Sequence, residues 1–173
     1  MSNESENVEY VIRQIFKTHG DDAVYITNTG YNSRLVHNMF PDKKNIFYMQ
    51  GSMGLSPAIA LGVAKNSRKD VVALVGDGSF LMHMGITHTI RSEGLSNIYV
   101  YVLDNGCHES VGEYPCVELE DSYPGVTKVF RVNTSGKFDR VKISFEDNAT
   151  NIRSFLSGTD LTESRTNKYK SNH

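Results

Sequence analysis

The chain has 173 residues, 39% of them apolar and 22% charged, and a formal net charge of −2 at pH 7. This length fits one domain of ordinary size that can bury a core. The charge lacks the basic footprint of a nucleic-acid-binding protein, and no apolar run approaches the ~20 residues that a membrane span needs. The polar, acidic N-terminus is unlike a signal or transit peptide.

The two cysteines, Cys107 and Cys116, lack the CxxC spacing of a zinc or redox site. Two thiols in a chain of this length also argue against a disulfide scaffold, and they fit a reducing compartment. We therefore expect a cytoplasmic protein that binds neither membranes nor nucleic acid.

Helical and strand patterns alternate along residues 5–106. Apolar residues at helical spacing predict helices over 5–19, 33–40, 55–66 and 79–94. Short β-type runs predict strands over 23–27, 45–49, 70–75 and 97–106. The run 70–75 is apolar throughout after Asp70, as expected of a strand covered on both faces. This alternation predicts an α/β fold, with a parallel sheet flanked by helices on both faces.

The pattern weakens after residue 106. Strands are predicted at 126–132 and 140–145, and a last helix at 146–158 with acidic residues in its first turn. The polar segment 159–173 is predicted to be a disordered tail. We therefore expect one domain, residues 1–158, followed by this tail.

Four of the predicted strands end in loops of small or polar residues. These loops are Asn28-Thr29-Gly30, Gly51-Ser52-Met53-Gly54, Gly76-Asp77-Gly78-Ser79 and Asp104-Asn105-Gly106. In a parallel sheet the carboxyl ends of the strands share one edge, where ligands of open α/β proteins bind. The four loops are therefore expected to meet there.

The loop at Gly76–Ser79 suggests a site for a phosphate and a metal. Gly78 and Ser79 precede a helix, so their N–H groups favour an anion. Asp77 would repel that anion unless a cation bridges them, which points to Mg²⁺ with Asn105 as a further oxygen ligand. The alternative is an ordinary tight turn in which Asp77 caps the helix, and the triplet alone favours that interpretation. The combination is more specific, because 26 residues (79–104) separate Gly78 from Asn105.

This combination resembles the diphosphate-binding motif of thiamine diphosphate enzymes, in which a second Asn usually stands where this chain has Asp104. The segment 47–64 resembles the loop that holds the aminopyrimidine ring in that family. The segments 27–36 and 103–112 resemble a narrower group, the phosphonopyruvate and sulfopyruvate decarboxylases. The run His108-Glu109-Ser110 is more similar to the phosphonopyruvate enzymes.

The resemblance implies a role for each matching residue. Asp77, Asn105 and the main-chain oxygen of Cys107 would bind Mg²⁺. The remaining cofactor-binding residues would line the diphosphate or hold the aminopyrimidine ring, with Met53 wedged between the two rings; they are Thr29, Gly30, Gly51, Ser52, Met53, Gly76, Gly78 and Ser79. His108 would face the substrate, to assist proton transfer or to contact a phosphonate.

Plainer interpretations stand beside these. Met53 is typical of core filler at the start of an apolar helix. Cys107 is compatible with any buried thiol. Arg34 fits a solvated helix face as well as a group that attracts an anionic substrate. His83 and His88 lie in a helical run and are interpreted as structural.

Enzymes of this family need a second domain, whose glutamate activates the cofactor, and the chain has no room for it before residue 20. The resemblance therefore implies one subunit of a hetero-oligomer, inactive alone, whose partner is a pyrimidine-binding chain. The implied reaction is decarboxylation of a small 2-oxo acid, with 3-phosphonopyruvate expected first. Sulfopyruvate decarboxylation, an acetolactate-synthase-like carboligation and a non-catalytic binding module remain alternatives.

Two departures from the family motivate the non-catalytic alternative. Where the family often reads Thr-Gly-Gly-Gln-Pro-Thr, this chain has Val111-Gly112-Glu113-Tyr114-Pro115-Cys116. The region 117–140 is also shorter than the family's, which leaves little room for the expected helix and strand.

Overall fold

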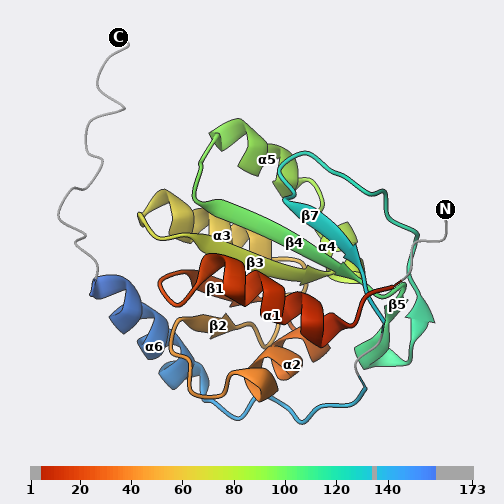
Figure 1. Cartoon of the computed structure of the whole chain (residues 1–173), viewed down its shortest axis with the longest axis horizontal. Helices are drawn as coiled ribbons and strands as arrows, with labels where there is room; N and C mark the ends of the chain where they lie inside the picture. Colours follow the sequence, from red (N-terminus) through yellow and green to blue (C-terminus); the bar gives the residue numbers. More distant parts are fainter. Residues whose placement is uncertain (1–4, 134–135, 159–173) are drawn as a thin grey trace.

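The protein was analysed as a computed structural model that describes residues 5–133 and 136–158. Its centre is a five-stranded parallel sheet in the order β2-β1-β3-β4-β7 (Figure 1). The strands are β1 (Val24–Thr27), β2 (Ile46–Tyr48), β3 (Val71–Gly76), β4 (Ile98–Asp104) and β7 (Lys128–Arg131). The predicted α/β fold class is confirmed, as are the five strands predicted at 23–27, 45–49, 70–75, 97–106 and 126–132.

Helices cover both faces of this sheet (Figure 1). They are α1 (Val8–His19), α2 (Tyr31–Met39), α3 (Ser56–Lys65), α4 (Asp77–Met82), α5 (Ile86–Glu93) and α6 (Phe145–Ser157). One hydrophobic cluster joins α1 and α2 to the first face, and a second joins α3, α5 and α6 to the other.

The strand β3 shows why its sequence is apolar throughout. Val72 and Leu74 pack in the cluster under α1 and α2, whereas Val71, Ala73 and Val75 pack in the cluster under α3. Side chains alternate between the two faces of a strand, so both faces must be apolar when both are covered.

The first and last described helices begin at side-chain caps. Asn7 Oδ1 accepts a hydrogen bond from Tyr10 N at 3.0 Å, and Ser144 Oγ accepts one from Asp147 N at 3.0 Å. Each cap satisfies a backbone N–H that has no partner within its helix. Helix α1 ends at Gly20, whose φ of 71° suits glycine.

The single helix predicted over 79–94 is wrong, because two helices replace it. Helix α4 ends at Met82, and the chain bends through His83, Met84 and Gly85 before α5 begins. The bend is held by tight-turn hydrogen bonds, and Thr87 Oγ1 also donates to Met84 O at 2.8 Å. Glycine lowers helix propensity at this point, and the bend lets α5 turn Ile90 onto the sheet.

The strand predicted over 140–145 is also wrong. Val141 and Ile143 pack against the first hydrophobic cluster, which explains their alternation, but residues 140–144 are irregular. The neighbouring edge strand β2 has its Tyr48 N–H and C=O occupied by the side chain of Asn148, at 3.3 and 2.8 Å. Helix α6 therefore covers the sheet edge where another strand would have to pair.

A small hairpin follows β4 that the sequence did not predict. Strands β5 (Cys107–His108) and β6 (Tyr114–Pro115) pair antiparallel, with a 3-10 helix, η1 (Glu109–Val111), between them. The segment 113–116, which departs from the family pattern, thus contains strand β6 of this hairpin. The tail predicted over 159–173 lies outside the described residues.

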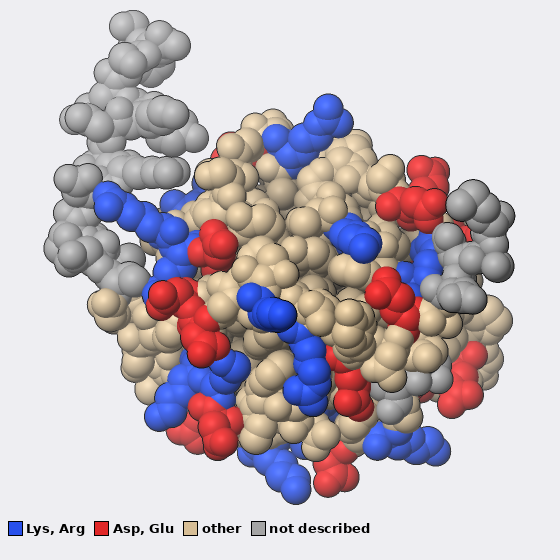
Figure 2. All heavy atoms as spheres, viewed as in Figure 1, with Lys and Arg blue, Asp and Glu red and all other residues tan. Residues whose placement is uncertain are grey.

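The surface carries charges of both signs. On the face seen in Figure 2, Lys and Arg side chains are interspersed with Asp and Glu side chains. Within residues 5–133 and 136–158, no helix is long and apolar enough to cross a membrane.

Candidate active site

The predicted loops meet at the carboxyl ends of the strands, around one cavity. The chain order reverses between β1 and β3, which is where open α/β sheets bind their ligands. Nine of the residues singled out from the sequence line this cavity: Thr29, Met53, Gly76, Asp77, Gly78, Ser79, Asn105, Cys107 and His108.

Asp77 is the most informative residue of the cavity. It is 4% exposed, and its Oδ1 accepts a hydrogen bond from Gly78 N at 2.8 Å. Its buried Oδ2 has no hydrogen-bond partner among the described residues. Burial raises the pKa of this carboxyl above its ordinary value, and the neighbouring Asp104 adds to the effect. A buried carboxylate oxygen without a partner fits a cation, because a cation would replace the lost hydration.

The turn after β4 brings Asn105 and Cys107 to the cavity that Asp77 also lines. Asn105 Oδ1 accepts from Cys107 N at 3.3 Å, and Asn105 Nδ2 donates to Glu109 Oε2 at 3.1 Å. Within the described residues, no group of three His, Cys, Asp or Glu side chains could hold a metal. One carboxylate, the Asn105 amide oxygen and a main-chain carbonyl would together make a set of hard oxygen ligands that suits Mg²⁺.

The ring of His108 lies directly over Gly78. A Cβ atom on Gly78 would stand 2.5 Å from His108 Nδ1 and 3.1 Å from Cys116 Sγ, so this close approach requires glycine. His108 Nε2 also contacts Cys116 Sγ at 3.3 Å. His108 thus packs on the backbone at the start of α4. Sequence reasoning missed Cys116 because only the hairpin pairing brings it back to this point.

A second link joins the loop after β1 to α4. Asn28 Nδ2 donates to Ser79 Oγ at 2.6 Å, and both residues are 2% exposed. Asn28 Oδ1 is buried without a hydrogen-bond partner among the described residues. Asn28 directly precedes the predicted Thr29-Gly30 pair, so its position in that loop could have identified it as a site residue.

The loop after β2 approaches the cavity through Met53 alone. Gly51 and Ser52 are exposed and lie outside the cavity lining. Met53 lines the cavity and is 38% exposed, so the core-filler interpretation is wrong. Gly54 has a φ of 91°, and a Cβ on it would lie 2.9 Å from Ser79 O, which brings this loop against α4.

Four other residues considered from the sequence lie elsewhere. Gly30 stands just outside the lining, where a Cβ would meet the Ser110 Oγ at 3.1 Å. Arg34 lies over the Tyr31 ring, and its Nη1 donates to Phe138 O at 3.4 Å. His83 and His88 are exposed, so neither is a core histidine.

The cavity has further lining residues that the sequence did not single out for the site. They are Val8, Asn28, Tyr31, Asn32, Leu103, Glu109, Ser110, Val132 and Asn133. Those that lie in or next to the predicted loops could have been inferred from the sequence, because the loops were expected to meet at this edge. Val8, Val132 and Asn133 come from α1 and from the end of β7, and only the tertiary fold places them here.

Comparison with known proteins gives a family match. The model of the thiamine pyrophosphate enzyme C-terminal TPP-binding domain matches residues 28–159. The chain is 30% identical over 153 residues to the sulfopyruvate decarboxylase subunit beta of Methanococcus maripaludis, covering 85% of this chain and 82% of that protein. It is 40% identical over 91 residues to the phosphonopyruvate decarboxylase of Streptomyces viridochromogenes, covering 53% of this chain and 23% of that protein.

A third relative and one solved structure complete the comparison. The sulfopyruvate decarboxylase subunit beta of Methanothermobacter thermautotrophicus is 38% identical over 92 residues, which is 53% of this chain and 49% of that protein. The matched region thus spans between about a quarter and a half of several of these relatives. The fold also resembles a putative thiamin diphosphate-dependent enzyme from Mycobacterium smegmatis, with a TM-score of 0.52 and 24% identity, covering 66% of this chain and 24% of that chain.

Proposed function

We propose a function from one premise: the chain belongs to the thiamine pyrophosphate enzyme family and has the fold of its C-terminal TPP-binding domain. The chain is the diphosphate-binding subunit of a decarboxylase that acts on a small anionic 2-oxo acid. The observation that carries this proposal is the buried Oδ2 of Asp77, which has no hydrogen-bond partner within residues 5–133 and 136–158, in a cavity that Asn105 and Cys107 also line.

The residues around the cavity divide by the part of the cofactor that they would hold. Mg²⁺ would bind Asp77, the Asn105 side chain and the Cys107 carbonyl. The diphosphate would lie near Thr29, Gly30, Gly76, Gly78 and Ser79, and the rings near Gly51, Ser52 and Met53. When bound, thiamine diphosphate supplies the electron sink that allows CO₂ to leave a 2-oxo acid.

For His108 we propose a place in the wall of the site and no chemical step. Its ring lies on Gly78 and beside Cys116, at the end of the cavity where the diphosphate would bind. From there it contributes an imidazole ring to the wall of the site. A contact with the phosphonate or sulfonate of a substrate is compatible with this place.

Two substrates fit the proposal, and different observations favour each. Sulfopyruvate is favoured by the long match, which covers 153 residues and 82% of the Methanococcus maripaludis beta subunit. Phosphonopyruvate is favoured by the higher local identity of 40% and by the run His108-Glu109-Ser110. The length of the first match leads us to place sulfopyruvate beside phosphonopyruvate rather than behind it.

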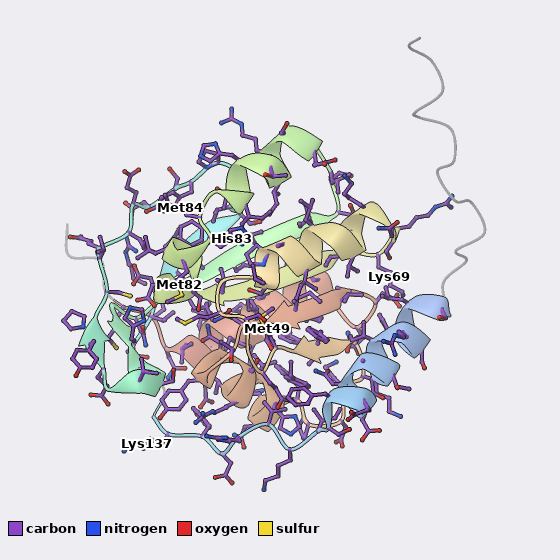
Figure 3. All side chains as sticks on the ribbon, turned by 180° about the vertical axis from the view of Figure 1, so that it is seen from behind. Met49, Lys69, Met82, His83, Met84 and Lys137 are labelled. Atoms are coloured by element: carbon purple, nitrogen blue, oxygen red, sulfur yellow. The ribbon has the colours of Figure 1, made fainter. Side chains whose placement is uncertain are left out.

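The partner is a pyrimidine-binding subunit that supplies the activating glutamate. The relatives named as beta subunits support an assembly of this kind. Met53 of the cavity lining also belongs to an exposed, uncharged surface, whose members are 37–61% exposed: Met53, Leu55, Met82 and Met84. We call these four residues the methionine rim. Figure 3 shows Met82 and Met84 together with His83 where α4 passes into α5.

The sequence around the methionine rim is free of formal charge. Residues 46–64 and 78–90 contain no Lys, Arg, Asp or Glu. The two segments touch, because a Cβ on Gly54 would lie 3.3 Å from the Cβ atoms of both Met82 and His83. Depletion of charge together with exposed methionine is typical of the core of a protein–protein interface.

The test is CO₂ release from sulfopyruvate and from 3-phosphonopyruvate, with Mg²⁺ and thiamine diphosphate present. The chain alone is compared with the chain co-expressed with the pyrimidine-binding protein encoded nearest to it. We expect activity in the complex only, and its loss to background in Asp77→Ala. Asp42→Ala, an exposed aspartate before β2, is the matched control and should leave the rate unchanged.

The other results separate the alternatives. Release of CO₂ from neither acid, in a complex that retains thiamine diphosphate, would move the proposal to another 2-oxo acid. A complex that forms but retains no cofactor would contradict it and support a non-catalytic module. Activity that survives Asp77→Ala would remove Asp77 from the site.

A further inference from the structure

We propose that Arg131 is a positioning residue for the cation site: it counters the charge of Asp104 and so holds the turn that presents Asn105 and the Cys107 carbonyl. This inference rests on the proposed function, since the metal and cofactor are those of that site. It adds a residue from β7, a strand that none of the motif residues occupies.

The side chain of Arg131 makes three polar contacts at the end of the sheet. One guanidinium nitrogen, Nη1, donates to Asp104 Oδ2. The other, Nη2, donates to Leu119 O and, at 3.2 Å, to Asp121 Oδ1. The Asp104 side chain is 8% exposed and that of Asp121 is 83% exposed. The buried pair with Asp104 is therefore the contact that matters, because exposed ion pairs contribute little.

The second oxygen of Asp104 shapes the turn. Asp104 Oδ1 accepts a hydrogen bond from Gly106 N at 3.0 Å, and Gly106 has a φ of 72°. The residues on either side of Gly106 are Asn105 and Cys107, and both line the cavity. One carboxylate thus joins the guanidinium on one side to the ligand-bearing turn on the other.

The position of Asp104 creates the need for a counter-charge. In the sheet register Gly76 of β3 pairs with Leu103 of β4, so Asp77 and Asp104 follow at the ends of neighbouring strands. Both carboxylates are buried, at 4% and 8% exposure. Two buried like charges repel each other unless each is compensated. Arg131, which pairs with Asp104 in the β4–β7 register, compensates one and leaves Asp77 for the cation.

The geometry also explains why the residue is an arginine. Its planar fork reaches Asp104 with one nitrogen and the Leu119 carbonyl with the other, so it also holds the segment that follows the hairpin. Lysine has the same charge but cannot make this divided contact. Arg131→Lys should therefore retain part of the effect, and Arg131→Met none of it.

The experiment compares Arg131→Met, Asp104→Asn and the double variant in the full chain, with Lys128→Met as the control on the same strand. The first measurement is hydrogen exchange of the Gly106 amide without ligands. We expect Arg131→Met to speed this exchange by about tenfold, because Asp104 without its counter-charge is repelled by Asp77 and no longer holds the Gly106 N–H in place. Asp104→Asn in the same chain should restore it, because the neutral amide needs no counter-charge and still accepts from Gly106.

The second measurement is the Mg²⁺ concentration that half-saturates thiamine diphosphate binding in the assembled complex. It should rise by about tenfold in Arg131→Met, because an Asp104 without its counter-charge would no longer hold the turn that presents Asn105, and it should return in the double variant. If Arg131→Met does not fold, Arg131→Lys with and without Asp104→Asn gives the same comparison at smaller amplitude.

The two readouts keep this inference separate from the proposed function. A wild-type complex that binds no thiamine diphosphate would overturn the proposed function and, with it, the role of Arg131 toward a cation. Exchange at Gly106 that is unchanged in Arg131→Met would overturn the inference alone. So would a double variant no better than Arg131→Met, because Arg131 would then act through packing and not through the charge of Asp104.

Discussion

At the scale of single residues, Asp77 carries an energetic cost in the cofactor-free protein. Burial raises the pKa of its carboxyl, so the folded state holds the proton more readily than the unfolded chain does. The stability that this group contributes is therefore present in full below the unfolded pKa of about 3.9. It is lost as the pH rises through the raised folded value.

Asp77→Asn should remove that cost while keeping the side-chain shape. At pH 8 in EDTA we expect a thermal midpoint higher by roughly 2–4 °C, the shift that about 1 kcal/mol gives in a domain of this size. The gain should shrink as the pH falls toward 4, and Asp42→Asn should show neither effect. Differential scanning calorimetry at both pH values checks this. A lower midpoint at pH 8 would mean that the carboxylate has a partner that the structure does not show.

Gly78 provides a steric test of the same loop. Gly78→Ala should push the His108 ring aside, because a Cβ there would stand 2.5 Å from its Nδ1. The ring is the end of a half-buried side chain that can move, so the cost should not exceed about 1 kcal/mol, the lower end of overpacking penalties. Gly62→Ala is the matched control, since Gly62 lies in α3 with no atom within 4 Å of a Cβ, and alanine there should stabilise the helix by about 0.5–1 kcal/mol. Urea denaturation of both variants gives the comparison.

The sequence predicted part of this residue-scale arrangement. Asp77 and Asn105 were within reach because the spacing of strands and turns places them at one sheet edge. The position of His108 over Gly78, and of Cys116 beside it, depends on the pairing of a two-residue hairpin, for which the sequence carries no signal. Arg131 could not be predicted for a similar reason: its contact with Asp104 depends on the pairing of β7 with β4, which the sequence does not show.

At the scale of elements, the sheet edge formed by β2 depends on one side chain. Asn148, which is 2% exposed, bonds both the N–H and the C=O of Tyr48. Asn148→Leu keeps the branched shape but leaves both backbone groups without a partner, so we expect a loss of about 2–6 kcal/mol, at about 1–3 kcal/mol for each group. Thr150→Ala, an exposed site two residues along α6, should change stability by less than about 0.5 kcal/mol. Chemical denaturation that gives equal values for both variants would contradict this role of α6.

Elements were predicted well where one physical cause dominates. The continuous apolar run of β3 follows from burial on both faces, and α3 follows from its apolar spacing with Pro57 in the first turn. The errors arose where tertiary packing decides. Val141 and Ile143 alternate because they line the first cluster, although Asn148 already occupies the edge strand. The bend between α4 and α5 allows the start of α4 to line the cavity while Ile90 of α5 packs against the sheet.

At the scale of the whole molecule, the cavity shares Met53 with the methionine rim, an exposed apolar surface of the kind that binds another protein. The fold brings β1 and β3 together at the switch point and places the loop after β2 and the end of α4 next to it. Met53 belongs both to the cavity lining and to the methionine rim. A subunit that covers the rim would therefore also close the mouth of the site, which is what an enzyme divided between two chains requires.

This arrangement predicts that the methionine rim holds the complex together. Met82→Glu combined with Met84→Glu should weaken binding of the pyrimidine-binding subunit by at least about 30-fold, the loss of one interface hot spot of about 2 kcal/mol. The thermal midpoint of the chain alone should stay close to wild type, because both side chains are exposed. Tyr10→Glu is the control for added charge: it places one negative charge, half of that in the test variant, on an exposed aromatic residue of α1, which covers the opposite face of the sheet. Titration calorimetry of the two purified subunits measures the affinities. Equal losses in both variants would indicate a general effect of added charge, whereas full affinity in the Met82/Met84 variant would move the partner to another surface.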